Sequence, residues 1–235
     1  MPDVTIAESL ERARQRLTRA LASAGRDSED ACLLAVSKTH PAASVRQAFA
    51  AGQRAFGENY LQEALDKQAS LDDLEGIVWH FIGPLQSNKT RAVAEHFQWV
   101  HTIDRERIAT RLDAQRPAAL GPLDICLQVN VSGETSKSGV SPEALPALAD
   151  AVIALPHLRL RGLMALPAPS DDPTAQRRPF AELRTLLETL RQRHPQAPLD
   201  TLSMGMSGDL EAAILEGATL VRLGTAIFGQ RAPHP

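Results

Sequence analysis

The sequence predicts an α/β fold, and within that class a closed barrel of eight parallel strands, the (β/α)8 or TIM barrel. Short apolar runs of strand length alternate eight times with longer segments of helical periodicity. The chain has 235 residues, close to the ~250 residues that are typical of one such barrel. No linker, low-complexity segment or shift in composition divides the sequence. We therefore expect residues 1–235 to form a single domain.

The elements of this barrel are predicted in chain order, beginning with an extra N-terminal helix at residues 5–24 whose apolar side chains fall at helical spacing. The strands are apolar runs that end at Gly, Pro or polar residues, at 32–37, 55–59, 77–82, 99–103, 123–131, 158–166, 201–204 and 220–224. Helices are predicted between them at about 43–51, 60–70, 88–97, 105–116, 142–155, 174–194 and 209–216. Asp104 is expected to cap the helix that follows it.

Composition and charge exclude several classes of protein. Hydrophobic residues make up 43% of the chain and charged residues 23%, so the chain can build a core and is not predicted to be disordered. The formal net charge is -3 and no long run of Lys or Arg occurs, which gives a nucleic-acid or membrane-surface role no support. No segment has the apolar length of a membrane span, and residues 1–26 lack the long apolar region of a signal peptide. We expect a cytoplasmic protein with neither a nucleic-acid nor a membrane partner.

The cysteines and His80 are of residue types that often bind metals, but in this sequence another role is expected for each of them. Cys32 and Cys126 lie inside apolar runs and are interpreted as buried thiols of a reducing compartment. His80, in the third predicted strand, is interpreted as a core histidine with satisfied hydrogen bonds. No group of Cys and His residues has metal-ligand spacing, so no metal site is predicted.

A lysine stands just beyond the first predicted strand. Residues 33–36 are apolar, and Lys38 follows them in a stretch that ends at Pro41. Lysine is almost never fully buried unless it is paired or has a function. One interpretation is a Schiff-base lysine at the mouth of the barrel, where the active sites of such barrels lie. The other is that Lys38 extends into solvent where the strand ends, and this stretch alone leaves both open.

The loops after the seventh and eighth strands are the usual phosphate site of such a barrel. Here residues 203–209 and 222–225 offer glycines, which let backbone N–H groups approach an anion, and hydroxyls, which add donors. The first loop also opens a predicted helix, whose N-terminus favours anions. The alternative is that Ser207 or Asp209 only caps that helix and the glycines form turns. The two loops together leave phosphate binding and this alternative in balance.

Arg222 interrupts the apolar run of the last predicted strand. By alternation it faces away from Val221 and Leu223, toward the interior of the barrel. A lysine, a phosphate cradle and an Asp or Arg opposite the pyridine nitrogen are what pyridoxal phosphate requires. Arg stays protonated itself, so it would leave the ring nitrogen neutral and the ring a weak electron sink. The alternative is a structural ion pair at the end of the strand.

Five motifs in a fixed order resemble the pyridoxal phosphate homeostasis protein family. They are AVSK (35–38), FGEN (56–59), WHFIGPLQSNK (79–89), LSMGMSGD (202–209) and VRLGT (221–225). The resemblance runs from the N-terminal helix to Gly229, nearly the whole chain. It implies a barrel of the alanine racemase N-terminal type, without that enzyme's second β domain.

The resemblance also implies a set of cofactor-binding residues. Lys38 is expected to hold pyridoxal 5'-phosphate as a Schiff base, with Arg222 near the pyridine nitrogen and Asn59 near the 3-hydroxyl. The phosphate is expected to be surrounded by Ser203, Ser207, Gly224 and Thr225, with Met206 contributing its backbone. In the segment VNVSGETSKSG (129–139), Lys137 is a candidate second lysine for handling or releasing the cofactor, although a solvated loop lysine fits the sequence equally well.

The function implied by the resemblance is intracellular vitamin B6 homeostasis, in which the chain buffers the cofactor or delivers it transiently to apo-enzymes that need it. No catalytic residue is assigned, and the resemblance favours a monomer. Tyr60 is the only tyrosine and begins a predicted helix, whereas a two-base racemase needs a base on each face of its substrate. Two alternatives stay open: a pyridoxal phosphate enzyme with weak amino-acid racemase or transaminase activity, and a Schiff-base aldolase that uses Lys38 without a cofactor.

Overall fold

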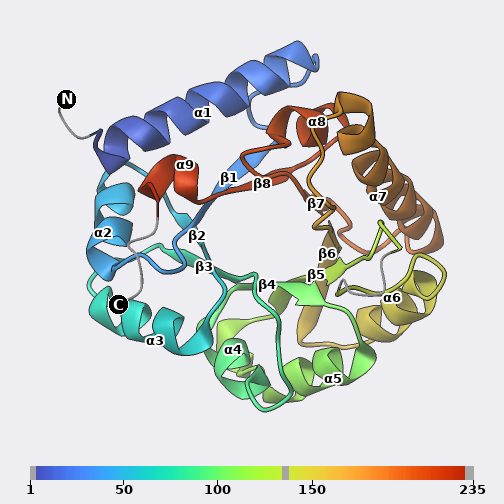
Figure 1. Cartoon of the computed structure of the whole chain (residues 1–235). Coiled ribbons are helices and arrows are strands. Elements are labelled where there is room, and N and C mark those ends of the chain that lie inside the picture. Colours follow the sequence, from blue (N-terminus) through green and yellow to red (C-terminus); the bar gives the residue numbers. More distant parts are fainter. Residues whose placement is uncertain (1–3, 134–137, 231–235) are drawn as a thin grey trace.

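Eight parallel strands form a closed barrel with helices around it (Figure 1). The computed structural model describes residues 4–133 and 138–230. Each strand pairs with its neighbours in chain order, and β8 (Leu220–Leu223) pairs with β1 (Cys32–Val36) to close the barrel. The prediction of a (β/α)8 barrel is therefore confirmed.

The remaining strands keep to the predicted apolar runs, although β5 and β6 end earlier. They are β2 (Ala55–Glu58), β3 (Val78–Phe81), β4 (Trp99–Ile103), β5 (Leu123–Gln128), β6 (Leu158–Met164) and β7 (Thr201–Ser203). The helices that follow the strands form the outer ring seen in Figure 1. They are α2 (Ala42–Ala50), α3 (Leu61–Ser70), α4 (Thr90–His96), α5 (Glu106–Gln115), α6 (Leu145–Ile153), α7 (Pro173–Arg193), α8 (Leu210–Leu215) and α9 (Thr225–Phe228).

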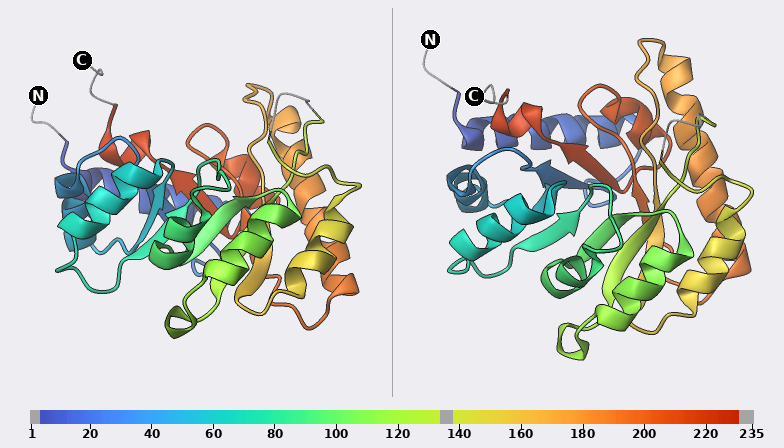
Figure 2. Two further views of the ribbon diagram at one scale, coloured as in Figure 1. Left: turned by 90° about the horizontal axis from the view of Figure 1, so that it is seen from below. Right: turned by 60° about the horizontal axis from the view of Figure 1, so that its bottom comes forward.

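The predicted N-terminal helix, α1 (Ile6–Ser23), is also confirmed. A capping box begins it: the Glu8 N–H donates to Thr5 Oγ1 at 3.2 Å, and the Thr5 N–H donates to Glu8 Oε2 at 2.8 Å. The helix contacts α2, α8 and α9, so it lies over the seam where β1 meets β8 (Figures 1 and 2). It therefore covers the place at which the barrel closes.

The main apolar core lies between the strands and the helices. Leu33 and Ala35 of β1 and Val221 and Leu223 of β8 belong to it, as the period of two along a strand requires. Arg222 lies between the latter two and is only 5% exposed. It therefore faces the lumen, as the alternation predicts.

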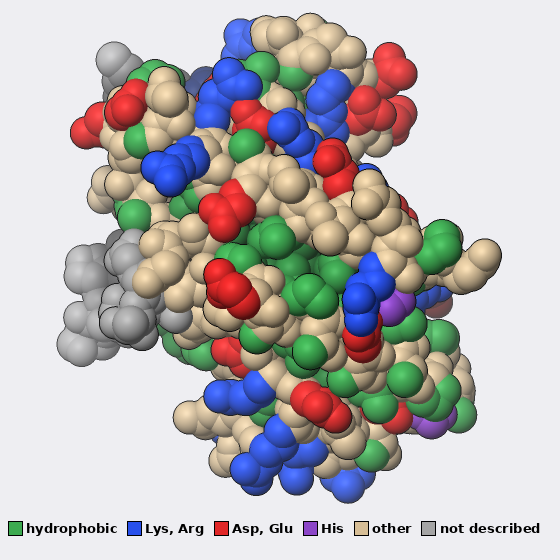
Figure 3. Space-filling model, turned by 90° about the vertical axis from the view of Figure 1, so that its right-hand side faces the viewer, with side chains coloured by type: hydrophobic (Ala, Val, Ile, Leu, Met, Phe, Trp, Pro, Cys, Tyr) green, Lys and Arg blue, Asp and Glu red, His purple; other side chains and the backbone are tan. Residues whose placement is uncertain are grey.

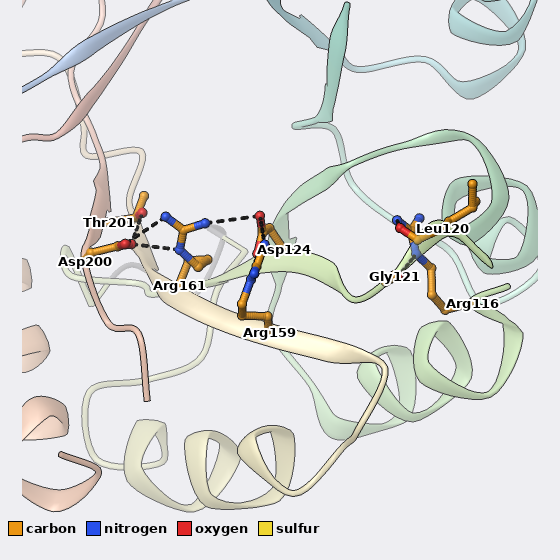
Figure 4. A network of polar contacts seen from close by, with 8 residues as sticks. All are labelled: Arg116, Leu120, Gly121, Asp124, Arg159, Arg161, Asp200 and Thr201. Atoms are coloured by element: carbon orange, nitrogen blue, oxygen red, sulfur yellow. Dashed lines mark hydrogen bonds and ion pairs between the residues drawn. The ribbon is translucent and has the colours of Figure 1, made fainter. Parts of the chain in front are cut away.

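An ion-pair network lies at the amino ends of β5, β6 and β7 (Figure 4). Asp124 accepts hydrogen bonds from Arg159 Nη2 at 2.9 Å and from Arg161 Nη1 at 3.1 Å. Arg161 Nη2 also donates to Asp200 Oδ2 at 2.7 Å, and its guanidinium lies 4.9 Å from the ring centroid of Trp99. Asp124 thus accepts from two arginines at once and holds the end of the barrel opposite to the predicted site.

Three local predictions differ from the structure. The helix α5 begins one residue later than expected, with Arg105 at its N-cap. No side chain caps it among the described residues, so Asp104 does not cap it. Cys32 is exposed rather than buried because it is the first residue of β1, whereas Cys126 is buried as expected. The helix α9 was not predicted, since four residues are too few to show a helical period.

The surface over α7 carries mixed charge. Figure 3 shows Lys and Arg side chains interspersed with Asp and Glu on this side of the molecule. Arg177 Nη2 and Arg184 Nη1 lie 2.6 and 2.7 Å from the two carboxylate oxygens of Glu216, which neutralises part of the positive charge of the helix. Within the described ranges, no helix combines the length and the apolar character that crossing a membrane requires.

We predict that Asp124→Asn destabilises the protein by about 1–3 kcal/mol, because it keeps the side-chain shape but removes the charge that two arginines share. Urea unfolding measures the change in the free energy of unfolding. Asp73→Asn is the matched control, since the Arg46–Asp73 pair is exposed and should contribute little. Equal stability of Asp124→Asn and wild type would show that the network contributes nothing.

Candidate functional site

Three predicted site residues come from neighbouring strands of the barrel. Lys38 lies two residues beyond β1, Asn59 directly follows β2, and Arg222 belongs to β8. These strands are consecutive around the barrel, and Leu34 of β1 pairs in register with Arg222. The fold therefore brings the three positions to one sector of the barrel, at its carboxyl end.

A buried lysine fixes the backbone on both sides of Lys38. Lys67 of α3 is 4% exposed, and its Nζ donates to the carbonyl oxygen of Ser37 at 2.6 Å. The same Nζ donates to Glu63 Oε1 at 2.5 Å, and that oxygen accepts the backbone N–H of Thr39 at 2.6 Å. The residues before and after Lys38 are thus both bound to the Lys67–Glu63 pair.

Glu58, which is fully buried, completes this network. Its Oε1 accepts from Lys67 Nζ at 2.7 Å and from Ser37 Oγ at 2.6 Å, while Oε2 has no hydrogen-bond partner in the described chain. Burial raises the pKa of Glu58, and the charge of Lys67 opposes that rise. Because the Glu58 carboxyl is fully buried, its accommodation depends on Lys67.

The backbone turns sharply directly after Lys38. Thr39 has a φ of 65°, a left-handed conformation that is rare for a β-branched residue. Its N–H is held by Glu63, and its Oγ1 donates to the carbonyl oxygen of Lys38 at 2.6 Å. Strain of this kind persists only where the surroundings enforce it, and it concentrates at functional sites. Here α3 enforces it.

Behind Arg222, a series of hydrogen bonds crosses the interior of the barrel; we call Arg222, Ser203, His101 and His80 the lumen chain. Arg222 Nη1 donates to Ser203 Oγ at 2.7 Å, and Nη2 donates to the carbonyl oxygen of Ala165 at 3.0 Å. Ser203 Oγ lies 2.8 Å from His101 Nδ1, and His101 Nε2 lies 2.9 Å from His80 Nδ1. The histidines belong to β3 and β4, which are not neighbours of β7 and β8, so these contacts run through the lumen.

Burial sets the charges along the lumen chain. It lowers the pKa of His80 to about 3 and holds the pKa of His101 well below its ordinary value, with the nearby His80 and Arg222 adding to the second effect. Burial also lowers the pKa of Arg222 to about 10. At neutral pH the guanidinium is therefore charged and both imidazoles are neutral. The ring centroids of His80 and Trp99 lie 5.3 Å apart in a stacked arrangement, and His80 Nδ1 contacts His101. His80 is therefore a core histidine, as predicted, with a hydrogen-bond partner at one of its two nitrogens.

Asn59 presents an unpaired acceptor near Lys38. Its Oδ1 is buried and has no hydrogen-bond partner in the part of the chain that the structure describes. Gly83 lets the backbone after β3 approach this residue, because a Cβ at position 83 would lie 2.1 Å from the carbonyl oxygen of Asn59. A buried oxygen without a partner costs free energy, and a ligand that donates a hydrogen bond would recover it.

The two candidate phosphate loops follow the adjacent strands β7 and β8. Ser207 of the first loop and Thr225 of the second are exposed, and Gly224 is half-buried. A Cβ at Gly224 would lie 3.1 Å from the carbonyl oxygen of Val36, the last residue of β1. The second loop therefore passes beside the segment that carries Lys38.

Two of the groups predicted to contact phosphate are engaged within the protein itself. The Met206 N–H donates to Asp209 Oδ1 at 2.7 Å. Ser203 is fully buried, with its hydroxyl on Arg222 and His101 of the lumen chain. A pocket of about 270 Å³ opens beside the loop that carries Met206, lined also by the loop after β6.

Sequence reasoning missed Lys67, Glu58 and His101. His101 leaves a signal that could have been used, since it is a polar residue at an inward position of a largely apolar strand. Lys67 and Glu58 leave none, because a lysine on a helix and a glutamate at a strand end are ordinary surface residues in sequence. Lys137, the predicted second lysine, lies outside the described residues.

Comparison with known proteins agrees with this fold. Residues 9–232 match the family of alanine racemase N-terminal domains, so the chain is a barrel of that class. A pyridoxal phosphate homeostasis protein from Pseudomonas aeruginosa is 64% identical over 227 residues, which cover 97% of this chain and 96% of the relative. One from Escherichia coli K12 is 54% identical over 228 residues, covering 96% and 97%. The chain belongs to the pyridoxal phosphate homeostasis protein family.

A solved relative has the same architecture. PipY from Synechococcus elongatus, solved without PLP, superposes with a TM-score of 0.86 at 42% identity, over 96% of this chain and 100% of PipY. PipY solved with PLP bound gives a TM-score of 0.81 at 40% identity over the same shares. Similarity of this extent covers the whole barrel rather than one motif.

We predict that Lys67→Met destabilises the protein by about 3–5 kcal/mol, because it leaves the Glu58 carboxylate buried without its cation. Chemical unfolding measures the loss, and Lys89→Met, at an exposed lysine, is the control. The double change Lys67→Met with Glu58→Gln should recover part of the stability. If Lys67→Met unfolds at the same urea concentration as Lys89→Met, the buried pair does not act as described.

We also predict that protonation of His80 makes stability fall in acid. Its folded-state pKa of about 3 lies below the ~6.5 of an unfolded chain, so between these values the unfolded state binds the extra proton. Stability is therefore fully present above pH ~6.5 and is lost as pH falls toward 3, by about 1.4 kcal/mol per pH unit for this group. Unfolding free energies measured from pH 7 to pH 4 should fall less steeply for His80→Phe than for wild type. Parallel curves would contradict the assignment.

Proposed function

We propose that this chain is a single barrel domain that binds pyridoxal 5'-phosphate as a Schiff base on Lys38 and serves vitamin B6 homeostasis by buffering or delivering the cofactor. One observation carries the proposal. The adjacent strands β8, β1 and β2, with the residues that follow β1 and β2, supply a buried arginine, a lysine and an amide oxygen. That oxygen has no partner among the described residues, and all three groups lie at one end of the barrel. The binding of PLP by PipY, at 40% identity, supports the same conclusion.

The residues present fit the chemistry of this cofactor. The Lys38 amine can condense with the aldehyde and release water. The buried Oδ1 of Asn59 can accept the hydrogen of the ring's hydroxyl, which would satisfy the orphaned oxygen. The exposed hydroxyls of Ser207 and Thr225, on two adjacent loops with glycines, can donate to the phosphate. When bound, pyridoxal phosphate supplies an electron-withdrawing ring for amino-acid chemistry.

Arg222 favours holding the cofactor over turning over substrates. Its guanidinium remains charged at neutral pH and has only donors, so it cannot take a proton from a pyridinium. A ring nitrogen that faces it stays unprotonated and withdraws electrons weakly. The binding site then keeps the cofactor in place while giving little stabilisation to a carbanion.

Among the described residues we assign no second base of a racemase. Tyr60 is the only tyrosine of the chain; it is 53% exposed at the N-cap of α3. A racemase needs a second acid–base group on the opposite face of the substrate, held within hydrogen-bond reach. These features favour a carrier or regulator over an enzyme. Incubating the loaded protein with a panel of amino acids, and measuring the rate of their conversion, tests the alternative. Racemisation or transamination of order 1 per second or faster would favour the enzyme.

We predict that protein mixed with pyridoxal phosphate absorbs in the visible and that borohydride reduction fixes the cofactor's mass on Lys38. Lys38→Ala should lose both signals and remain folded, because this position lies beyond the strand and outside the core. Lys89→Ala is the control and should keep both signals. A wild type that stays colourless and gains no mass would refute the proposal and leave the cofactor-free aldolase.

We predict that Arg222→Glu shifts the absorption of the bound cofactor, because a carboxylate can hold a proton on the ring nitrogen that arginine cannot. Circular dichroism checks that the variant is folded. Arg178→Glu, at an exposed position of α7, is the control and should leave the spectrum unchanged. An unaltered spectrum in folded Arg222→Glu would mean that Arg222 does not face the ring.

Delivery is a separate claim from binding. Transfer of cofactor from the loaded protein to an apo-enzyme, followed with and without a scavenger of free pyridoxal phosphate, separates the two modes. Direct delivery predicts activation of the apo-enzyme that the scavenger does not block, and buffering predicts activation that it does block. The same assay with Lys137→Ala tests whether that lysine takes part in release.

A further inference from the structure

The lumen chain places four polar side chains where barrels of this kind usually pack branched apolar ones. Arg222, Ser203, His101 and His80 are 5%, 0%, 0% and 3% exposed. Burial of such groups is costly unless their donors and acceptors are paired with one another. The pairing therefore limits where each hydrogen in the chain can lie.

The direction of the lumen chain follows from its first member. Arginine has donors only, so the 2.7 Å contact with Arg222 makes Ser203 Oγ an acceptor there. The one hydroxyl hydrogen of Ser203 then points at its other partner, His101 Nδ1, at 2.8 Å. A neutral His101 that accepts at Nδ1 carries its hydrogen on Nε2 and donates it to His80 Nδ1 at 2.9 Å.

The reverse direction leaves a buried donor without an acceptor. If His101 Nδ1 carried the hydrogen, Ser203 Oγ would accept from both Arg222 and His101, and its own hydrogen would need a third partner. Within the described residues, the hydroxyl of Ser203 has no hydrogen bond other than these two. An unpaired buried hydroxyl costs more than the favoured arrangement, in which the hydroxyl hydrogen of Ser203 and the Nε2 hydrogen of His101 each have an acceptor.

Arg222 is held at two of its nitrogens by this arrangement. Nη2 donates to the carbonyl oxygen of Ala165 at 3.0 Å, and Nη1 donates to Ser203. A backbone carbonyl cannot rotate, but a serine hydroxyl can, so the second anchor is only as rigid as whatever fixes the hydroxyl. That group is His101, whose Nε2 hydrogen is in turn accepted by His80 Nδ1 in the favoured arrangement.

We propose that His101, backed by His80, is a positioning residue: through Ser203 it holds the Arg222 guanidinium in the orientation that faces the ring nitrogen of the bound cofactor. This role rests on the proposed function, because it concerns a ring that Arg222 would face. Neither histidine touches the cofactor in this scheme, and neither transfers a proton to it. Their effect on the cofactor passes through the orientation of one guanidinium.

The tautomers can be measured without any cofactor. In protein labelled with 15N-histidine, long-range 1H–15N correlation spectra at pH 7 distinguish hydrogens on Nδ1 from hydrogens on Nε2. The proposal predicts that His101 and His80 are both neutral with hydrogen on Nε2. A hydrogen on Nδ1 of His101, or an imidazolium at either residue, would overturn it.

Two substitutions then test the effect on the cofactor. His101→Leu removes the acceptor for Ser203, and we expect roughly tenfold weaker binding of pyridoxal phosphate together with a displaced absorption maximum. His101→Asn returns an acceptor oxygen close to the position of Nδ1 and should restore most of both. His96→Leu, at an exposed histidine, is the control. A purely structural role predicts lower stability with an unchanged spectrum, and that result would overturn the proposal.

Failure of this proposal is distinguishable from failure of the proposed function. A wild type that takes up no pyridoxal phosphate refutes the function, and the positioning role with it. A wild type that loads normally, beside a folded His101→Leu with the same spectrum and affinity, refutes only the positioning role. If His101→Leu does not fold, His101→Asn and the tautomers of the wild type still decide.

Discussion

Closure of the barrel between β1 and β8 is the constraint on which the rest of this structure depends. The pairing sets Leu34 against Arg222, and the absence of a side chain at Gly224 lets the loop after β8 pass Val36. Only a closed barrel makes the first and last strands neighbours, so residues almost two hundred positions apart in the chain meet at one edge. The helix α1 covers this seam.

Polar side chains lie below the barrel mouth as well as at it. They belong to two buried networks. On the outer side, Lys67 binds the backbone around Lys38 and is matched by Glu58 and Glu63. In the lumen, the charge of Arg222 is stabilised by hydrogen bonds to neutral partners. Both networks are costly to assemble, and both end beside the residues proposed to hold the cofactor. They fix backbone and side-chain directions where a ligand would need a preformed site.

The sequence predicts the fold well because the period of two along a strand is a local property. Alternation alone placed Arg222 in the lumen, and the strand ends identified Lys38 and Asn59. A local pattern could not predict that Lys67 contacts Ser37 or that His101 contacts Ser203, because these residues are 30 and 102 positions apart in the sequence. The predicted end residue of a helix was also wrong, since Arg105 rather than Asp104 is the N-cap of α5. The predicted burial of Cys32, at the start of β1, was wrong as well. Such details depend on tertiary contacts that no local pattern contains.

The most direct test of the central claim is a crystal structure of this protein grown with pyridoxal phosphate. We expect density continuous from Lys38 Nζ to the cofactor, with the ring hydroxyl at Asn59 Oδ1 and the ring nitrogen facing Arg222. The phosphate should lie between the loops that carry Ser207 and Thr225. A cofactor bound away from the barrel mouth, or a ring nitrogen turned away from Arg222, would contradict it.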